Sequence, residues 1–267
     1  MWPGIFLNDD KHCIEKHAAL SLLAMRAMIL AAGLGTRLRP LTNTTPKALA
    51  PVAGRPLIEY ALRFVRAQGI REVVINLHHL GDQIRARLGD GRDYGVRITY
   101  SVEERLLETG GGVKQAQAFL DGGTFLVVNS DAILDLDLAA VLAAHQRNRA
   151  VASLVLRPDP DAASYGLLEI DRSGRLRRLR GQPAGVDEPL SAYMFTGCQI
   201  LEPRVFDFMP ELKPFSLTRQ TYIEMLRAGE PLYGFVHTGP WMVVDDAEGM
   251  ARATQAIRSG RLRLSYL

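Results

Sequence analysis

A glycine-rich loop that carries two cations follows an apolar run near residue 30. Ala27–Ala32 is apolar enough for a buried strand, and Gly33 and Gly35 come directly after it. Arg37 follows, and Lys47 lies ten residues beyond it. Glycines let backbone N–H groups approach phosphate oxygens closely, and the cations neutralise the phosphate charge. The loop therefore predicts a site for a polyphosphate.

Two common phosphate loops do not match this one. A P-loop needs Gly-x-x-x-x-Gly-Lys-Ser/Thr, a string that the chain lacks. The dinucleotide fingerprint needs a third glycine where Leu38 stands, and an acidic residue about twenty positions later at the end of a strand. Glu59 has that spacing, but it lies in a segment with helical periodicity. Because Gly-x-Gly alone is weak evidence, the interpretation depends on the longer string.

The longer string resembles the signature of the sugar-1-phosphate nucleotidyltransferases, Gly-x-Gly-Thr-Arg-Leu-x-Pro-Leu-Thr-x-x-x-Pro-Lys. All ten specified positions match, namely Gly33, Gly35, Thr36, Arg37, Leu38, Pro40, Leu41, Thr42, Pro46 and Lys47. The resemblance extends from about Arg26 to Ala253. The chain is most similar to short uridylyl- and guanylyltransferase members, such as the N-acetylmuramate 1-phosphate uridylyltransferases and the mannose-1-phosphate guanylyltransferases.

The resemblance implies an α/β, Rossmann-like nucleotidyltransferase fold with a mixed, mostly parallel central sheet and a small β-rich sugar-binding part. It also implies a Mg²⁺-dependent enzyme that transfers a nucleoside monophosphate from an NTP to a sugar 1-phosphate, giving an NDP-sugar and pyrophosphate. The alternative is a homologue that has lost catalysis and binds a nucleotide or an NDP-sugar. Neither the base nor the sugar follows from the motif.

The resemblance assigns the catalytic roles. Arg37 is expected to bind the leaving pyrophosphate, and Lys47 the phosphates near the reacting centre. Asp131 ends the apolar run Val127–Asn129 at the position of the family's Mg²⁺ ligand. A hard cation held by a carboxylate and substrate phosphates is the usual magnesium arrangement. The positions expected to bind the nucleotide are Leu30, Ala32, Gly33, Gly35, Thr36, Arg37, Lys47, Thr109, Gly110 and Asn129.

Four residues are expected to bind the sugar phosphate: Glu103, Gly166, Arg180 and Gly197. Glu103 is the first residue of the stretch 103–112, which resembles the family's second nucleotide segment; it either forms a hydrogen bond with the sugar or base, or lies in an exposed loop. Gly166 and Gly197 match glycines that flank the sugar. Many members carry Glu-Lys-Pro where this chain has Gly181-Gln182-Pro183 after Arg180, so Arg180 either replaces the lysine or is solvated.

The C-terminal motif departs from the family. Members usually show Trp-x-Asp-x-Gly-Thr, in which the Asp is the second metal ligand, but Val243 stands at that position after Trp241. Residues two apart on an extended strand point to the same face, so Asp245 can approach the same site. We therefore expect Asp131 and Asp245 to be the metal ligands.

Hydrophobic patterns alternate between strand and helix as far as about residue 150. Alternating strands and helices predict a parallel sheet that binds ligands at the carboxyl ends of its strands. The predicted strands are Ala27–Ala32, Glu72–Leu77, Val96–Val102 and Thr124–Asn129, and the predicted helices are Pro56–Gln68, Gly81–Leu88, Gly110–Phe119 and Asp137–His145. Later strands are expected at Val151–Leu156, Gly166–Asp171, Arg175–Leu179, Ala192–Leu201 and Leu232–Val236, with helices at Thr218–Ala228 and Ala247–Arg258.

These patterns predict one nucleotidyltransferase domain over residues 25–267. Its nucleotide-binding part covers about 25–150 and its sugar-phosphate-binding part 151–267, while residues 1–24 are an N-terminal extension of uncertain order. A chain of 267 residues with 47% hydrophobic content can bury such a core. Arg26 interrupts the apolar stretch 18–32, which argues against a membrane segment.

Charge and cysteine content set the remaining expectations. A net charge of +3 suits phosphorylated small molecules, and the arginine run 172–180 lacks interleaved aromatics, so nucleic acid is not expected as a partner. Cys13 and Cys198 have no metal-ligand spacing and suit a reducing cytoplasm. His78 and His79 have no third ligand nearby and are interpreted as structural. A homo-oligomer is a further expectation.

Overall fold

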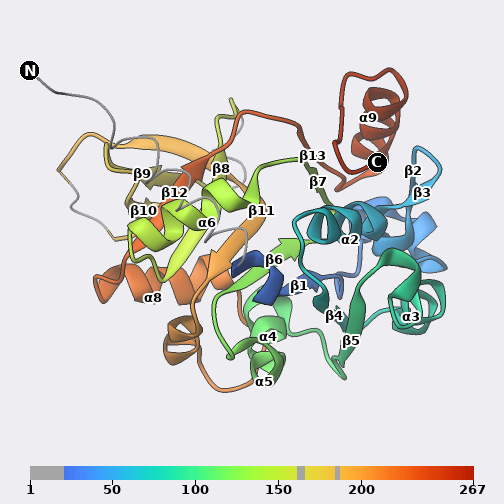
Figure 1. Cartoon of the computed structure of the whole chain (residues 1–267), viewed down its shortest axis with the longest axis horizontal. Helices are drawn as coiled ribbons and strands as arrows, with labels where there is room; N and C mark the ends of the chain where they lie inside the picture. Colours follow the sequence, from blue (N-terminus) through green and yellow to red (C-terminus); the bar gives the residue numbers. More distant parts are fainter. Residues whose placement is uncertain (1–20, 161–165, 184–186) are drawn as a thin grey trace, which may run out of the picture.

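The central sheet has nine strands in the part of the chain that the computed structural model describes, residues 21–160, 166–183 and 187–267. The strand order is β10-β9-β11-β6-β1-β4-β5, and β8 pairs with β11 and β12. Helices cover both faces of this sheet (Figure 1). The predicted mixed α/β sheet is confirmed.

Four strands form the parallel part, in which β1 lies between β4 and β6 and β5 forms the edge. They are β1 (Arg26–Leu30), β4 (Glu72–Leu77), β5 (Arg97–Val102) and β6 (Phe125–Asn129). Successive side chains of a strand point to opposite faces. In β1, Ala27 and Ile29 accordingly enter one core cluster and Met28 the other.

The later strands add a mixed part, in which β12 pairs parallel with β8 and the other pairs are antiparallel. These strands are β8 (Ala152–Arg157), β9 (Leu168–Ile170), β10 (Leu176–Leu179), β11 (Ser191–Leu201) and β12 (Leu232–Val236). The long strand β11 pairs with β9 through its first three residues, with β8 from Met194 onward and with β6 from Cys198 onward. It therefore joins the sugar-side strands to the parallel sheet.

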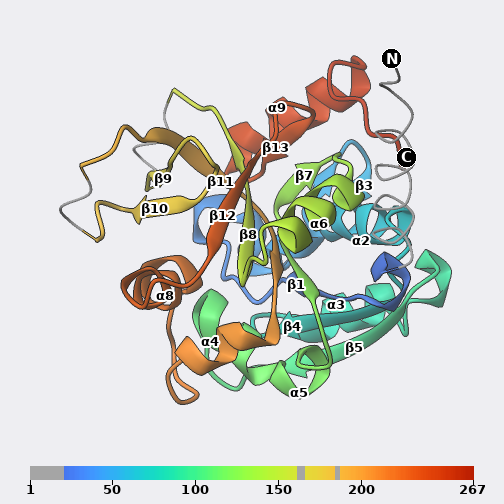
Figure 2. The same ribbon diagram turned by 60° about the vertical axis from the view of Figure 1, so that its left-hand side comes forward.

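Two helical layers enclose the sheet (Figure 2). One core cluster contains residues of α2 (Leu57–Ala67), α3 (Gly81–Leu88) and α6 (Leu138–Arg147). The opposite cluster contains residues of α4 (Glu108–Gln115), α5 (Gln117–Leu120) and α8 (Tyr222–Arg227). The last helix, α9 (Ala247–Arg258), packs in a third, smaller cluster.

Short elements complete the chain. Two small ladders join β2 (Pro51–Val52) to β3 (Arg55–Pro56) and β7 (Ala132–Leu134) to β13 (Trp241–Val243). The single-turn helices are η1 (Thr36–Leu38), η2 (Leu41–Asn43), η3 (Lys47–Leu49), η4 (Arg92–Tyr94), η5 (Pro203–Phe208) and the π-helical η6 (Leu217–Thr221). The pairing of β7 with β13 was not predicted, because three-residue strands show no periodicity.

The other sequence predictions agree with the structure to within a few residues. The predicted helix 110–119 is divided at Ala116 into α4 and α5, and the helix expected at 218–228 begins with the π turn of η6. Residues 1–20 lie outside the described residues, whereas Leu22 is buried in the first core cluster. Within the described ranges, no helix combines the length and apolarity that a membrane span requires.

Helix α4 begins with three glycines that lie against other segments. A Cβ atom on Gly111 would lie 2.5 Å from the carbonyl oxygen of Lys213 and 2.8 Å from Cβ of Leu107. The N–H groups of Gly110 and Gly111 both donate to the carbonyl oxygen of Phe215. The glycines thus allow the segment 213–215 to pack against the start of α4.

We expect Gly111→Ala to lower the free energy of unfolding by about 1–3 kcal/mol, because its methyl group would overlap a backbone oxygen that cannot move freely. Gly122→Ala is the matched control, since its Cβ would meet only the end of the Arg26 side chain at 3.3 Å. Urea unfolding of both variants measures the difference. Equal stability of the two variants would contradict the packing described here.

Candidate active site

The candidate site lies where the parallel strands end. After β1, the backbone N–H of Ala31 donates to Oδ1 of Asn76 at 2.7 Å, and Asn76 itself lies near the end of β4. After β6, the N–H of Ser130 donates to the carbonyl oxygen of Leu30 at 3.0 Å. These bonds fix the chain as it leaves β1, and so they fix the start of the glycine-rich loop.

The glycine-rich loop is held by its own side chains. Gly35 has φ 61°, and a Cβ there would lie 2.9 Å from both Cβ of Lys47 and Cγ2 of Thr42. The buried Thr42 hydroxyl donates to the carbonyl oxygen of Gly35 at 2.8 Å. Only glycine combines this positive φ with so close an approach. The loop therefore folds back on itself and brings Lys47 beside Gly35.

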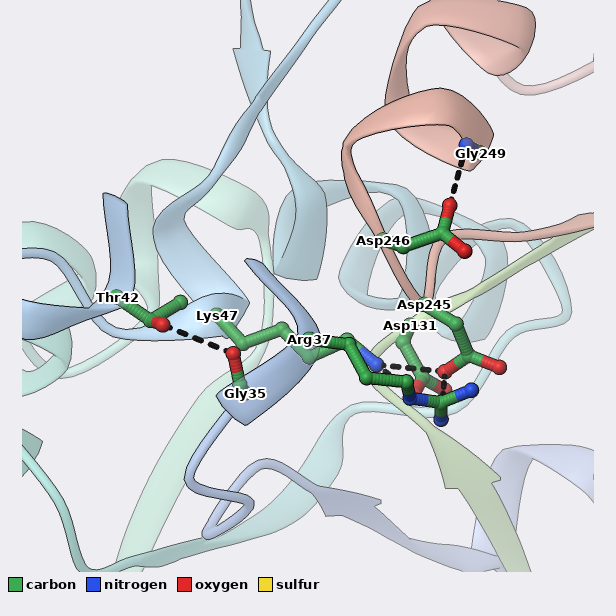
Figure 3. A network of polar contacts seen from close by, with 8 residues as sticks. All are labelled: Gly35, Arg37, Thr42, Lys47, Asp131, Asp245, Asp246 and Gly249. Atoms are coloured by element: carbon green, nitrogen blue, oxygen red, sulfur yellow. Dashed lines mark hydrogen bonds and ion pairs between the residues drawn. The ribbon is translucent and has the colours of Figure 1, made fainter. Parts of the chain in front are cut away.

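Two cations and two carboxylates form a charge cluster at the centre of the site (Figure 3). The Lys47 ammonium donates to Oδ2 of Asp131 at 2.6 Å and to Oδ1 of Asp245 at 2.9 Å. Nη2 of Arg37 lies 3.0 Å from the same Oδ1 of Asp245. The predicted catalytic cations and the predicted metal ligands are therefore in direct contact in the folded chain.

The members of the cluster differ in exposure. The side chain of Lys47 is 13% exposed and that of Asp245 17%, whereas that of Arg37 is 64% exposed. Burial lowers the pKa of the Lys47 ammonium, but Asp131 and Asp245 outweigh burial, so the net pKa is raised. A raised lysine pKa means that its contribution to stability is lost only as pH rises through the alkaline range. The ion pairs are complete at neutral pH.

The ladder between β7 and β13 brings Asp245 to Asp131. Val243 pairs with Ala132, and the N–H of Val244 continues the ladder by donating to the carbonyl oxygen of Asp131 at 3.0 Å. The next residue, Asp246, caps α9 by accepting from the N–H of Gly249 at 2.7 Å (Figure 3). Asp245 thus lies beside Asp131, as the alternation of side chains along an extended strand predicts.

A cavity of about 160 Å³ lies against the charge cluster. All four members of the charge cluster line it. The eight predicted site residues in its lining are Leu30, Gly33, Gly35, Thr36, Arg37, Lys47, Asp131 and Asp245. Ala31, Ala48 and Ser130 also line it and were not predicted. Its size suits phosphate groups, and Arg37 and Lys47 supply the cations that phosphates require.

A second cavity of about 320 Å³ adjoins the first and shares Leu30, Gly33 and Asp131 with it. The predicted residues Ala32, Thr109 and Asn129 line this cavity. Its far wall comes from the segment 216–219, where the N–H of Leu217 donates to Oγ1 of Thr109 at 3.1 Å. Its apolar lining and position suit a nucleoside next to the phosphates.

Residues that the sequence analysis missed complete the second cavity. Asn76, Leu106, Glu108, Ser216 and Arg219 line it, and Arg219 forms an ion pair with Glu108. Asn76 carried a usable signal, because it is the polar residue in an otherwise apolar strand. Nothing local in the sequence indicates that Arg219 lies beside Glu108, which is 111 residues away.

Glu103 was expected either to bind the sugar or base or to lie in an exposed loop, but it is buried. It is 2% exposed, and its carboxylate accepts from Nδ2 of Asn76 at 2.7 Å and from the N–H of Leu107 at 2.8 Å. Burial raises its pKa, although those two hydrogen bonds lower it. Both oxygens are occupied, so Glu103 supports the cavity through Asn76 instead of contacting a substrate. Gly110 likewise lies behind the cavity wall, since its N–H donates to Phe215.

The predicted sugar-side residues lie outside these two cavities. Gly166 adjoins Arg180, whose guanidinium would overlap a Cβ built on Gly166. Gly197 packs on the Asn129 side chain, with Nδ2 at 3.0 Å from a Cβ built on the glycine. Gly197 therefore adjoins the nucleoside cavity through Asn129, whereas Arg180 and Gly166 lie together beyond β9. Tyr165, expected beside the sugar, lies outside the described residues.

The two histidines are engaged with backbone groups. Nδ1 of His78 lies 2.9 Å from the carbonyl oxygen of Glu103, and Nε2 of His79 lies 3.0 Å from that of Thr42. Each histidine ties an active-site segment to the end of β4. Their interpretation as structural residues agrees with this geometry.

The carboxylates Asp131 and Asp245 fit a magnesium ion that is shared with a substrate. Both approach one ammonium group, so a cation already occupies the point where their oxygens converge. Over the described ranges, no group of three or more His, Cys, Asp or Glu residues is placed to hold a metal. Mg²⁺ is commonly held by one or two carboxylates together with substrate phosphates. The donor set suits that arrangement.

Comparisons with known proteins identify the family of the chain. Residues 26–260 match the family described as nucleotidyl transferase. A UTP–glucose-1-phosphate uridylyltransferase of Synechocystis is 31% identical over 252 residues, which cover 90% of this chain and 65% of the relative. An N-acetylmuramate α-1-phosphate uridylyltransferase of Neisseria meningitidis is 55% identical over 117 residues, 43% of this chain and 51% of the relative. The matched region thus spans less than two thirds of these relatives' own lengths.

Solved structures share the fold. A Bacillus anthracis protein, provisionally named a glucose-1-phosphate thymidylyltransferase and crystallised with a sucrose, superposes with a TM-score of 0.75 at 26% identity. The match covers 88% of this chain and 95% of that protein. HddC of Yersinia pseudotuberculosis gives a TM-score of 0.72 at 21% identity, over 87% of this chain and 99% of HddC. The architecture is therefore that of known nucleotidyltransferase structures.

We expect Lys47→Ala to weaken the binding of a nucleoside triphosphate by about 10- to 100-fold, because a charged hydrogen-bond donor is lost and two carboxylates then face the phosphates. The melting temperature should change little, since Arg37 still pairs with Asp245. Arg92→Ala removes an equal charge from an 88% exposed side chain and is the control. Calorimetric titration of both variants measures the effect, and equal affinities would refute the phosphate site.

Proposed function

Because the chain belongs to the nucleotidyl transferase family, we propose that it transfers a nucleoside monophosphate from an NTP to a sugar 1-phosphate, releasing pyrophosphate and an NDP-sugar. One observation carries this proposal: the contact of Arg37 and Lys47 with Asp131 and Asp245 at the carboxyl ends of the strands. The adjoining cavities provide space for the phosphates and for the nucleoside.

The reaction requires positioning and charge neutralisation more than covalent help. An oxygen of the sugar phosphate attacks the α-phosphorus of the NTP, and the bond between that phosphorus and the bridging oxygen of the β-phosphate breaks. Lys47 neutralises charge near the reacting phosphorus, and Arg37 neutralises charge on the leaving pyrophosphate. Donors that are already in place stabilise developing charge without reorganisation. The folded loop supplies both cations in this way.

We also propose that Mg²⁺ is the cofactor and that Asp131 and Asp245 hold it. When bound between carboxylates and phosphates, the ion neutralises phosphate charge and orients the reacting groups. The charge balance supports this assignment. An incoming triphosphate draws Lys47 and Arg37 toward its oxygens, and the two carboxylates they leave then need another cation.

The proposed substrates are UTP and N-acetylmuramate 1-phosphate. The relative named for this reaction is 55% identical over its matched residues, and the Synechocystis relative, at 31% identity, is also named for UTP. The second cavity offers a carboxylate acceptor at Glu108 and donors at Arg219 and Ser216. Uracil presents one N–H donor between two carbonyl acceptors, which this combination can match.

A reducing, cytoplasmic compartment is a further part of the proposal. It is supported by the buried Cys198 thiol, whose pKa burial raises to about 12.

Val243 favours a second candidate, a homologue that binds nucleotide without turning it over. The family's second metal ligand is missing at that position, and Asp245 is its replacement only if it can leave Lys47 and Arg37 when substrate enters. The two candidates differ in one measurable property, the release of pyrophosphate.

We expect the protein to release pyrophosphate from UTP with N-acetylmuramate 1-phosphate and Mg²⁺, and to do so faster than with ATP, CTP, GTP or dTTP. Asp131→Asn should abolish turnover while the protein remains folded, because it removes a carboxylate from the reacting centre. A coupled pyrophosphate assay over NTPs and sugar 1-phosphates provides the measurement. Nucleotide binding without pyrophosphate release over the whole panel would establish the binding-only candidate.

The position of the second carboxylate should set the Mg²⁺ requirement. We expect Asp245→Asn to raise the Mg²⁺ concentration that gives half-maximal rate, and Val243→Asp to lower it, because the second variant adds a carboxylate on the same face of the strand. Val243→Asn is the control, since it places a side chain of the same shape at position 243 without the negative charge. Turnover that appears only in Val243→Asp would show that the natural chain has lost catalysis.

A further inference from the structure

A third cavity, of about 670 Å³, lies where β13 begins. It is bordered by the end of β8, the loop 238–240 and the second half of α9. Its charged lining is entirely cationic and comes from Arg157, Arg252 and Arg261, and its apolar lining includes Trp241 and Met242. A cavity with this lining suits an anionic group attached to a mostly apolar or carbohydrate body.

Arg157 is the residue of this cavity that lacks a partner. Its guanidinium carbon lies 4.8 Å from the ring centroid of Trp241, so the planar group is stacked on the indole. Its Nε is buried and has no hydrogen-bond partner, and none of the ion pairs between described residues includes this guanidinium. Buried donors in native proteins are almost always satisfied, and an exception calls for a missing ligand or water.

The other two arginines of the cavity, Arg252 and Arg261, differ from Arg157 because each has a hydrogen-bond partner. Arg252 donates to Glu248 one turn earlier in α9, and Nε of Arg261 donates to the Ser259 hydroxyl at 3.2 Å. Both side chains keep further donors, and they raise the positive potential around Arg157 without neutralising it. An anion that enters the cavity would therefore meet an uncompensated guanidinium at Arg157.

Trp241 connects this cavity to the reacting centre. Its indole N–H donates to the carbonyl oxygen of Thr196 at 2.9 Å, next to Gly197, which packs on Asn129. Trp241 and Asp245 are four residues apart on an extended stretch, so their side chains emerge on the same face. The separation along the strand is about 13 Å. This distance is of the order spanned by a hexose 1-phosphate whose phosphate lies near Asp245 and whose acidic substituent is contacted by the long side chain of Arg157.

We propose that Arg157, supported by Arg252 and Arg261, binds a carboxylate carried by the sugar, and that this subsite selects acidic sugar 1-phosphates over neutral ones. The proposal rests on the proposed function. N-acetylmuramate differs from N-acetylglucosamine by a lactyl ether that ends in a carboxylate. The guanidinium matches a carboxylate with two parallel N–H donors, and stacking on Trp241 fixes its plane before the sugar arrives.

The test compares N-acetylmuramate 1-phosphate with N-acetylglucosamine 1-phosphate in the wild type and in Arg157→Gln. We expect the wild type to prefer the acidic sugar, and Arg157→Gln to lose about 10- to 100-fold in kcat/KM for it while its kcat/KM for the neutral sugar is unchanged. Arg261→Gln, at an exposed side chain, should lose severalfold on the acidic sugar alone. Equal losses on both sugars, or none in either variant, would overturn the subsite.

A binding measurement keeps the two proposals separable. Free N-acetylmuramate should raise the melting temperature of the wild type more than free N-acetylglucosamine does, and Arg157→Gln should remove the difference. If this difference exists without turnover of either sugar phosphate, the subsite stands and the proposed function fails. If turnover exists but neither variant alters the preference for the acidic sugar, the proposed function stands and the subsite fails.

Discussion

The Lys47 ammonium, held between the carboxylates of Asp131 and Asp245, is the interaction on which the site depends. The three residues come from the first loop, the end of β6 and the end of β13, segments that meet only when the sheet is complete. The net rise in the pKa of Lys47 shows that the carboxylates more than compensate its burial. Lys47, the proposed catalytic cation, is therefore charged, largely buried and part of the cavity lining.

The same cluster explains how an empty site and a loaded site can both be electrostatically balanced. Without substrate, two cations neutralise two carboxylates at close range. In the proposed reaction, a triphosphate competes for the two cations, and the proposed Mg²⁺ compensates the two carboxylates. The protein then exchanges partners within one group of charges, with no need to bury an unpaired ion at any stage. Because Arg37 is largely exposed, its side chain is the freer of the two cations to follow a phosphate.

The sequence allowed the strand, the glycine-rich loop and the charged residues of this cluster to be predicted, because each depends on local chemistry or on side-chain alternation. Asp245 is the clearest case, since its place follows from the period of a strand. The burial of Glu103 and the contact of Glu108 with Arg219 could not be predicted in this way. Both depend on how α4 packs against the segment 213–219. Three adjacent glycines form that contact, and because glycine has no side chain, a hydrophobic pattern cannot predict it.

Strand β13 positions proposed functional side chains at both of its ends: Asp245 lies two residues beyond its last residue, and Trp241 is its first. Near Asp245, the Val244–Asp131 backbone bond and the Asp246 cap of α9 fix the backbone on either side, so the carboxylate has little freedom to drift from Lys47. At the other end, Trp241 is bonded to β11 and holds the Arg157 guanidinium. A carboxylate moved from position 243 to 245 keeps the same face but lies farther from Trp241. If Asp245 holds the metal as proposed, the longer span to the Arg157 cavity suits the proposed sugar, which carries a bulky acidic substituent, better than an unmodified hexose.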